Sequence, residues 1–270
     1  MNNLSLRIIT GSVYVVSLIS CLLISKFTFI FFFFLIAFIG LNEYFKIVEK
    51  LEFKANKPVG FIISFILFLI FISFSFFPEF TKYLVSSLIF SLFILFISPL
   101  TNKNNTSIHS ISSTLLGLVY VCLPLFISFL IAFENENYNY QTILSTFIMV
   151  WLSDVGGYAI GVKFGKRKLN ENISPKKTWE GVIGSLIFCI IGGLVLPLYF
   201  ETFSNFEWIL FSILVCIFSI LGDLVESMFK RNANIKDSGT ILPGHGGILD
   251  RFDSILFVLP MVYLFQIIIK

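Results

Sequence analysis

The chain has 270 residues, of which 57% are hydrophobic and only 13% charged, and its formal net charge is +3. Because soluble domains carry about 25% charged residues, this composition excludes an ordinary water-soluble domain and indicates a membrane protein. The net charge is too small to indicate nucleic-acid binding. The four cysteines form no CxxC pair, so neither a metal site nor a disulfide framework is predicted from them.

Long apolar stretches predict nine transmembrane helices. Each approaches the ~20 residues that cross a bilayer, and none alternates as a membrane-spanning strand does. The first lacks a small-residue cleavage site, so we expect a retained helix and not a signal peptide. The predicted fold is an all-α, polytopic transmembrane helical bundle. Its spans are residues 6–25, 27–45, 58–77, 83–100, 113–133, 141–162, 180–200, 207–229 and 254–269.

The basic residues are distributed unevenly between the two sides of this arrangement. Sixteen of the nineteen Lys and Arg residues fall on the N-terminal side, and the other side has only Lys26, Lys82 and Lys270. By the positive-inside rule, the N-terminus and the long basic loops are predicted to be cytoplasmic.

The sixth predicted span contains an acidic residue and a glycine repeat. Asp154 lies within apolar sequence, where a carboxylate costs about 2.5–3.5 kcal/mol on insertion scales. Two interpretations remain open: a functional carboxylate, or an Asp that pairs with a neighbouring Lys. Gly157, Gly161 and Gly165 recur every four residues, which favours the close approach of another helix.

The segment ISPKKTWEG, residues 173–181, resembles the beginning of a helix. Ser174 can cap a helix whose first residue is Pro175. The free N–H groups of that helix, beside Lys176 and Lys177, would suit a phosphate. Alternatively, the two lysines lie at the membrane interface and attract anionic headgroups.

An acidic stripe ends the eighth predicted span. Asp223, Glu226, Ser227 and Lys230 follow i, i+3, i+4, i+7 spacing and therefore share one helix face. The ninth span then begins with LDRFDS, which contains Asp250. Facing helix ends could bring Asp223 and Asp250 together, and two such carboxylates suit a Mg²⁺ ion that keeps waters and shares substrate phosphates.

The loop between these spans is polar and rich in glycine. Its glycines permit positive φ and close approach to a ligand, but the absence of GxxxxGK[ST] excludes a P-loop. His245 is open to three interpretations: a hydrogen-bond donor to a phosphate, a proton-transfer group or a structural residue. The glycines are Gly239, Gly244, Gly246 and Gly247, and the basic residues are Lys230, Arg231, Lys236 and Arg251.

The stretch SMFKRNANIKDSGTILPGHGGILDRFD resembles the signature of the phosphatidate cytidylyltransferase family, also called CDP-diacylglycerol synthases. Resemblance covers roughly residues 150–254 and includes DVGGYAIGVKFGK and ISPKKTWEG, whereas the first 140 residues are similar only in being hydrophobic. The fixed signature residues are all present: Ser227, Lys230, Arg231, Lys236, Asp237, His245, Gly246, Gly247, Asp250, Arg251 and Asp253.

The resemblance implies a reaction in which CTP and phosphatidic acid give CDP-diacylglycerol and pyrophosphate. It also implies a Mg²⁺ cofactor, in two ions, and a homodimer in a bacterial-type inner membrane, with the active site facing the cytoplasm. A monovalent cation could assist in neutralising charge, although no residue identifies one. We accordingly expect N-terminal transmembrane helices over residues 1–140 (spans 1–5) and a catalytic region over 141–270 (spans 6–9).

Residue roles follow from the resemblance together with the spacing. Asp223 and Asp250 are the predicted Mg²⁺ ligands, and Lys230 and His245 join them as predicted catalytic residues. Asp154, Glu180 and Glu226 are expected to support the site. The predicted substrate-binding residues are Lys176, Lys177, Ser227, Arg231, Lys236, Asp237, Gly246, Gly247, Arg251 and Asp253.

Two other functions compete with this prediction. A secondary transporter would also carry carboxylates within its helices, but no internal repeat is visible and the polar residues cluster on one side. A CTP-dependent lipid-alcohol kinase would transfer the γ-phosphate in place of the nucleotide, and the complete signature argues against it.

Overall fold

A computed structural model describes residues 3–101, 108–134, 137–244 and 246–269. These residues are mostly helical, which confirms the all-α prediction. Among these residues, eight helical segments are long and apolar enough to cross a membrane, with Ile108–Ala132 counted as one segment, and the apolar part of the first helix, Ile9–Ile24, is shorter. The α-helices are α1 (Asn3–Ile24), α2 (Lys26–Lys50), α3 (Lys57–Phe76), α4 (Pro78–Thr101), α5 (Ile108–Gly117), α6 (Leu123–Ala132), α7 (Gln141–Phe164), α8 (Trp179–Val195), α9 (Asn205–Asn232) and α10 (Leu249–Ile269).

The remaining elements are short. A π-helical turn, η1 (Leu118–Cys122), joins α5 to α6, and a 3₁₀ turn, η2 (Leu196–Leu198), follows α8. Two antiparallel hairpins connect helices. They are formed by β1 (Phe133–Glu134) with β2 (Asn137–Tyr138), and by β3 (Lys168–Asn170) with β4 (Ser174–Thr178).

Local sequence signals set several helix boundaries. Ser25 separates α1 from α2, and it forms a capping box: its Oγ accepts a hydrogen bond from the Thr28 backbone N–H (3.1 Å) while Thr28 Oγ1 accepts one from the Ser25 N–H (3.1 Å). Asn56 caps α3 with a single hydrogen bond, which its Oδ1 accepts from Val59 N–H (3.3 Å). A single residue therefore joins α1 to α2, which agrees with the close spacing of the predicted spans 6–25 and 27–45.

The chain divides into two compact units. Unit 1 comprises Met1–Tyr138 and Asn232–Arg251, and unit 2 comprises Asn139–Arg231 and Phe252–Lys270. The polar loop after α9 thus groups with the N-terminal helices. The functional division predicted at residue 140 stays a prediction.

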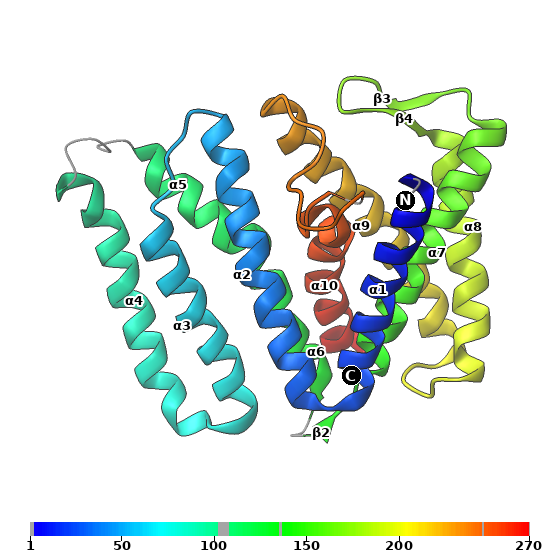
Figure 1. Cartoon of the computed structure of the whole chain (residues 1–270). Coiled ribbons are helices and arrows are strands. Elements are labelled where there is room, and N and C mark those ends of the chain that lie inside the picture. The colour runs from blue at the N-terminus through cyan, green and yellow to red at the C-terminus, as the bar shows by residue number, and fades with distance from the viewer. Residues whose placement is uncertain (1–2, 102–107, 135–136, 245, 270) are drawn as a thin grey trace. The chain divides into compact units, whose positions relative to one another are not determined.

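Unit 1 contains α1 to α6, with α3 and α4 side by side (Figure 1). Its core includes several phenylalanine rings, such as Phe29 and Phe129, whose centroids lie 5.5 Å apart edge to face. Gly40 of α2 leaves room for Leu249 at the start of α10, since a Cβ there would lie 3.2 Å from the Leu249 Cδ2.

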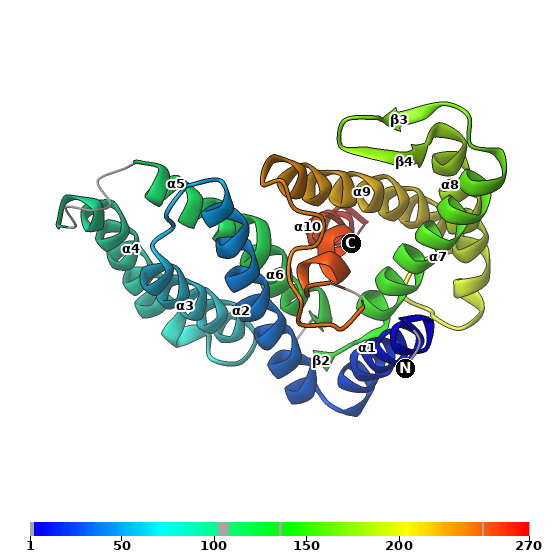
Figure 2. The same ribbon diagram turned by 45° about the horizontal axis from the view of Figure 1, so that its top comes forward.

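Unit 2 contains α7, α8, most of α9 and most of α10. The β3–β4 hairpin lies at the end of unit 2 where α7 ends and α8 begins (Figure 2). Arg231 Nε donates to the Ile173 carbonyl oxygen (3.3 Å), which places the end of α9 beside the same hairpin. Gly222 packs against the Asp253 backbone of α10. Polar and charged residues from four helices therefore gather at one end of unit 2.

Candidate active site

Small residues let α7 and α8 pack closely beneath the hairpin. A Cβ on Gly156 would lie 2.6 Å from the Gly184 carbonyl oxygen, and a Cβ on Gly157 would lie 2.6 Å from Ser185 Oγ. The Ser185 hydroxyl also donates to the Ser153 carbonyl oxygen (2.6 Å). The close helix approach predicted from the glycine repeat is confirmed.

The structure corrects the predicted beginning of α8. Ser174 and Pro175 do not start a helix, because the backbone from Ser174 to Thr178 forms strand β4. Thr178 is the actual cap, and its Oγ1 accepts a hydrogen bond from Gly181 N–H (3.1 Å). The two lysines expected in a first helical turn, Lys176 and Lys177, therefore lie on the strand.

Glu180 fixes the hairpin to the helix. One of its carboxylate oxygens accepts hydrogen bonds from the backbone N–H groups of Lys166 (3.0 Å) and Arg167 (3.1 Å). This non-local pairing of chain segments outweighs the local capping signal at Ser174. In the structure Glu180 supports the hairpin, and its predicted support of the active site stays a prediction.

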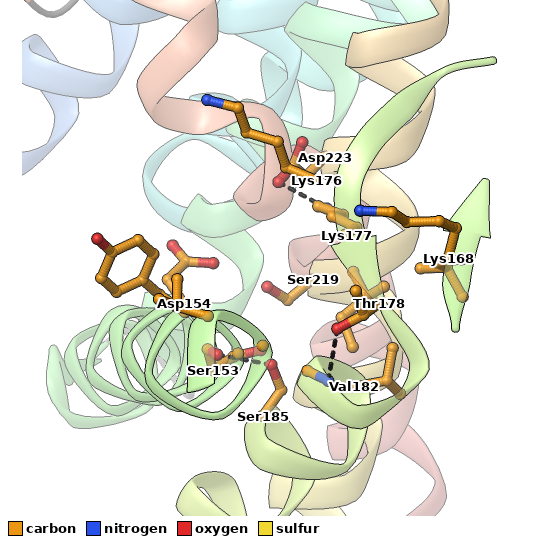
Figure 3. Close-up of a pocket in the computed structure, with 17 residues that line it drawn as sticks. Ser153, Asp154, Lys168, Lys176, Lys177, Thr178, Val182, Ser185, Ser219 and Asp223 are labelled. Atoms are coloured by element: carbon orange, nitrogen blue, oxygen red, sulfur yellow. Dashed lines mark hydrogen bonds and ion pairs between the residues drawn. The ribbon is translucent and has the colours of Figure 1, made fainter. Parts of the chain in front are cut away.

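A cavity of about 550 Å³ opens between α7, α8, α9 and the hairpin. Its walls include apolar side chains, among them Val162, Val182 and Ile220. In Figure 3, Asp154 and the Lys177–Asp223 pair lie around this space. Charged residues from four elements, α7, β3, β4 and α9, line it: Asp154, Lys168, Lys176, Lys177 and Asp223.

One ion pair crosses the cavity wall. Lys177 Nζ lies 2.6 Å from Asp223 Oδ2, and the two side chains remain 26% and 32% exposed. Ser227 Oγ donates to the other oxygen, Asp223 Oδ1 (3.2 Å). Asp154, Lys177 and Asp223 are called the cavity cluster below. Because this ion pair is accessible, either charge can exchange its partner for a ligand.

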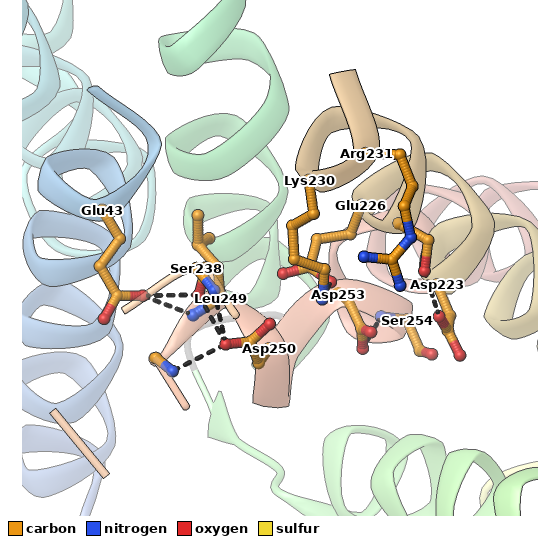
Figure 4. Close-up of polar contacts among 12 residues, drawn as sticks. Glu43, Asp223, Glu226, Lys230, Arg231, Ser238, Leu249, Asp250, Asp253 and Ser254 are labelled. Atoms are coloured by element: carbon orange, nitrogen blue, oxygen red, sulfur yellow. Dashed lines mark hydrogen bonds and ion pairs between the residues drawn. The ribbon is translucent and has the colours of Figure 1, made fainter. Parts of the chain in front are cut away.

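The acidic stripe on α9 shares one face, as predicted. Glu226 and Lys230, one turn apart, form an ion pair. Both are buried, with 1% and 9% of the residue exposed. Asp253 of α10 is half-buried nearby, and both Asp223 and Lys230 act on it electrostatically (Figure 4).

A second group of carboxylates lies in unit 1, around the polar loop between α9 and α10, which is called the signature loop below. Asp250 is 9% exposed, and its Oδ2 accepts hydrogen bonds from Ser238 N–H (2.8 Å), Ser238 Oγ (2.9 Å) and Gly247 N–H (2.7 Å). Glu43 of α2 reaches the same serine, with its Oε2 3.2 Å from Ser238 Oγ (Figure 4). Glu43, Ser238 and Asp250 are called the loop cluster below.

Gly246 shows why the signature loop needs glycine. Its φ of +82° is unfavourable for other residues, and a Cβ there would collide with Asp250 Oδ2. Gly244 also has a positive φ, +77°.

The other predicted site residues are in varied settings. Arg231 is exposed and contacts the hairpin, as described above. His245 lies outside the described residues. The remaining predicted substrate-binding side chains from the loop are exposed: Lys236, Asp237 and Arg251.

The predicted metal ligands, Asp223 and Asp250, belong to different units, and their pairing stays a prediction. Among the described residues, no group of three or more His, Cys, Asp or Glu side chains is placed to hold a metal ion. Mg²⁺ needs only one or two carboxylates when it keeps waters and binds substrate phosphates. The hard oxygen donors of Asp223 and Asp250 have the right chemistry for that ion.

Sequence reasoning missed Glu43. It lies within the predicted span 27–45, and an acidic residue inside a span is a functional-site hypothesis by default. Its burial, with 1% exposed, makes that signal stronger. Its partners in the loop follow almost 200 residues later in the sequence, so they could not be read from local pattern.

The fold and these polar clusters define a class of protein: a multispanning helical membrane protein with a charged cavity where several helices end. The model of the family described as "Cytidylyltransferase family" matches residues 5–269. The chain therefore belongs to the cytidylyltransferase family.

Individual relatives agree with this assignment. Proteins named phosphatidate cytidylyltransferase from Staphylococcus aureus (strain COL) and Staphylococcus haemolyticus (strain JCSC1435) are each 46% identical to this chain over 163 residues. The protein of that name from Staphylococcus saprophyticus is 45% identical over the same length. Each match covers 60% of this chain and 61% of the relative, so the chain spans about three fifths of the length of these relatives.

Proposed function

We propose that this protein is an integral membrane enzyme that transfers the cytidylyl group of CTP to phosphatidic acid. The products are CDP-diacylglycerol and pyrophosphate. The observation that carries the proposal is the complete signature between Ser227 and Asp253 in a chain of the cytidylyltransferase family. The name shared by the similar staphylococcal proteins supports the same reaction.

The cavity in unit 2 suits an amphipathic reactant. Its volume, about 550 Å³, lies within the roughly 300–1,000 Å³ of small-molecule sites. Lysines on one wall can bind phosphate, and Val162, Val182 and Ile220 can contact acyl chains. A lipid phosphate entering here would meet Lys176 and Lys177 on β4.

The reaction joins two anions and needs charge neutralisation more than covalent catalysis. An oxygen of the phosphatidate phosphate forms a bond to the α-phosphorus of CTP. The bond from that phosphorus to the bridging oxygen of the β-phosphate breaks, and pyrophosphate leaves with this oxygen. In our proposal Lys230, Arg231, Lys236 and Arg251 hold the phosphates of the two reactants.

Mg²⁺, in two ions, is the proposed cofactor, held by Asp223 and Asp250. When bound, it would neutralise charge on the attacking and leaving oxygens. Lys177 forms an ion pair with Asp223 Oδ2 in the structure. Lys177 can therefore neutralise Asp223 or turn to a substrate phosphate, and Ser227 orients the second oxygen of Asp223.

We also propose a bacterial-type inner membrane as the location, with the N-terminus and the active site on the cytoplasmic side. The one-sided distribution of Lys and Arg supports this orientation. The proposed assembly is a homodimer, by analogy with the family that the sequence resembles. Chemical labelling of single cysteines in sealed vesicles tests the orientation, and mass measurement in detergent tests the dimer.

The decisive experiment follows two labels of CTP. Purified protein in mixed micelles receives phosphatidic acid, Mg²⁺ and CTP labelled at either the α- or the γ-phosphate. We expect α-label in a lipid product and γ-label in pyrophosphate. Label from the γ-phosphate in lipid would identify a lipid kinase, and no turnover would refute both activities. An Asp223→Asn, Asp250→Asn double variant serves as the inactive control.

A further inference from the structure

Glu43 supplies a cap to a helix other than its own. Its Oε2 accepts a hydrogen bond from the backbone N–H of Leu249 (2.9 Å). Leu249 is the first residue of α10, and an N–H in the first turn has no acceptor within its own helix. A carboxylate at this end is also favoured by the helix dipole. The side chain on α2 thus caps the first turn of α10.

The same carboxylate is joined to Asp250 through one hydroxyl group. Ser238 Oγ lies 3.2 Å from Glu43 Oε2 and 2.9 Å from Asp250 Oδ2. A serine hydroxyl carries a single hydrogen, so it can donate to only one of these oxygens at a time. Glu43 and Asp250 therefore share this hydroxyl, and Ser238, whose backbone N–H also binds Asp250 Oδ2, couples the positions of the two carboxylates.

Two glycines of the loop pack directly on the Glu43 side chain. The three heavy atoms nearest to a Cβ built on Gly239 all belong to Glu43, with the carboxyl carbon at 2.9 Å. A Cβ on Gly247 would lie 2.6 Å from Glu43 Oε1 and would also collide with Ser238 Oγ. The loop is wrapped around this carboxylate without space for a methyl group.

The burial of Glu43 is costly in itself. Within the described part of the chain, its Oε1 is buried and has no hydrogen-bond partner. A carboxylate in this state is unfavourable unless other interactions compensate for it. Since its side chain contacts the loop and the start of α10, its contribution lies in the geometry of those segments.

We infer that Glu43 is a positioning residue for cytidylyl transfer: it holds the signature loop and the first turn of α10 so that Asp250 is presented correctly. This inference rests on the proposed function. It assigns a role in the reaction to the N-terminal helices, for which the sequence resemblance predicts no site residues.

Three variants of the full-length protein test this role. Glu43→Ala removes the acceptor, whereas Glu43→Gln keeps an oxygen for Leu249 N–H and an amide that can donate to Ser238 Oγ. Glu49→Ala is the matched control, because Glu49 is on the same helix but pairs with Lys57 at the surface (2.7 Å). Hydrogen exchange of peptides from 236–244 and 246–250 is measured together with kcat and the KM for CTP.

We expect Glu43→Ala to speed exchange in the loop and to lower kcat about 10–100-fold, the scale for residues that orient a metal ligand. KM for CTP should change much less. Glu43→Gln should recover most of kcat, and Glu49→Ala should match the wild type. Unchanged kcat in Glu43→Ala, or a Gln variant as impaired as the Ala variant, would overturn the positioning role.

A double-mutant cycle tests the contact itself. Gly239→Ala should speed loop exchange and lower kcat in the wild type, since the new methyl group meets Glu43. In the Glu43→Ala background the same change should have little further effect. Equal effects in both backgrounds contradict the contact. A wild-type protein without transfer refutes the proposed function, whereas an active wild type with fully active Glu43→Ala refutes only this inference.

Discussion

The cavity cluster and the loop cluster use carboxylates in opposite ways. In the cavity cluster, Asp223 pairs with a lysine side chain, and both groups are about a quarter to a third exposed. In the loop cluster, Asp250 is buried and bonded to two backbone N–H groups and a serine. A flexible ammonium partner can be exchanged for a ligand, whereas the backbone partners of Asp250 Oδ2 hold that oxygen in place. Substitutions in the first should therefore alter binding, and those in the second should alter turnover.

The Glu226–Lys230 pair gives the strongest test, because it is as buried as the loop cluster yet made of two opposite charges. Lys230→Met should lower the free energy of unfolding by about 3–5 kcal/mol, since it leaves Glu226 buried without its cation. Thermal unfolding in detergent measures this. The double variant Glu226→Gln, Lys230→Met should recover much of the stability but none of the transfer activity. Equal instability of both variants would contradict a specific charge effect.

Asp250→Asn tests the loop cluster at its predicted metal ligand. The side chain keeps its size and one acceptor oxygen but loses its charge. We expect CDP-diacylglycerol formation to fall about 10²–10³-fold, the range for losing one preorganised electrostatic interaction in catalysis. Expression and membrane insertion should persist. Near-normal activity would remove Asp250 from the metal site.

Lys177→Met tests the cavity cluster. The lost charged contact to a phosphate should lower kcat/KM by roughly 10–100-fold, corresponding to about 1.5–3 kcal/mol for a hydrogen bond to a charged group. Because the Lys177–Asp223 pair is partly exposed, unfolding should change by less than about 1 kcal/mol. Steady-state kinetics with varied phosphatidic acid measures the first effect. Lys163→Met, an exposed lysine at the end of α7, is the control and should behave as the wild type.

Patterns along one helix were predictable from the sequence. The α9 stripe and the glycine repeat in α7 depend only on helical periodicity, and the structure confirms both. Interactions between distant segments were not. Ser174 was a plausible cap by local rules, yet Glu180 binds the backbone of Lys166 and Arg167 and favours a hairpin there.

The loop cluster shows the same limit more strongly. The partners of Glu43 lie 195 and 206 residues away along the chain. A lone acidic residue in an apolar span was visible in the sequence. Its hydrogen-bond partners, however, depend on how α2 packs against the loop. The roles of the signature residues stay predictions, because their spacing indicates chemistry and not which phosphate each one contacts.

The smallest expected effect concerns the hairpin that borders the cavity. Thr178→Ala should destabilise the protein by about 1 kcal/mol, the usual cost of losing a helix N-cap, because Gly181 N–H loses its acceptor. Ser174→Ala, four residues earlier on the same strand, should change unfolding by less than about 0.5 kcal/mol. Both variants remove a hydroxyl group, but Thr178→Ala also removes a buried methyl group, so Thr178→Ser, which keeps the hydroxyl, isolates the contribution of capping. A larger loss of stability in Ser174→Ala than in Thr178→Ala would contradict the cap at Thr178 and place the beginning of α8 at Pro175. Lys176 and Lys177 would then belong to a helix N-terminus and not to the strand beside the cavity.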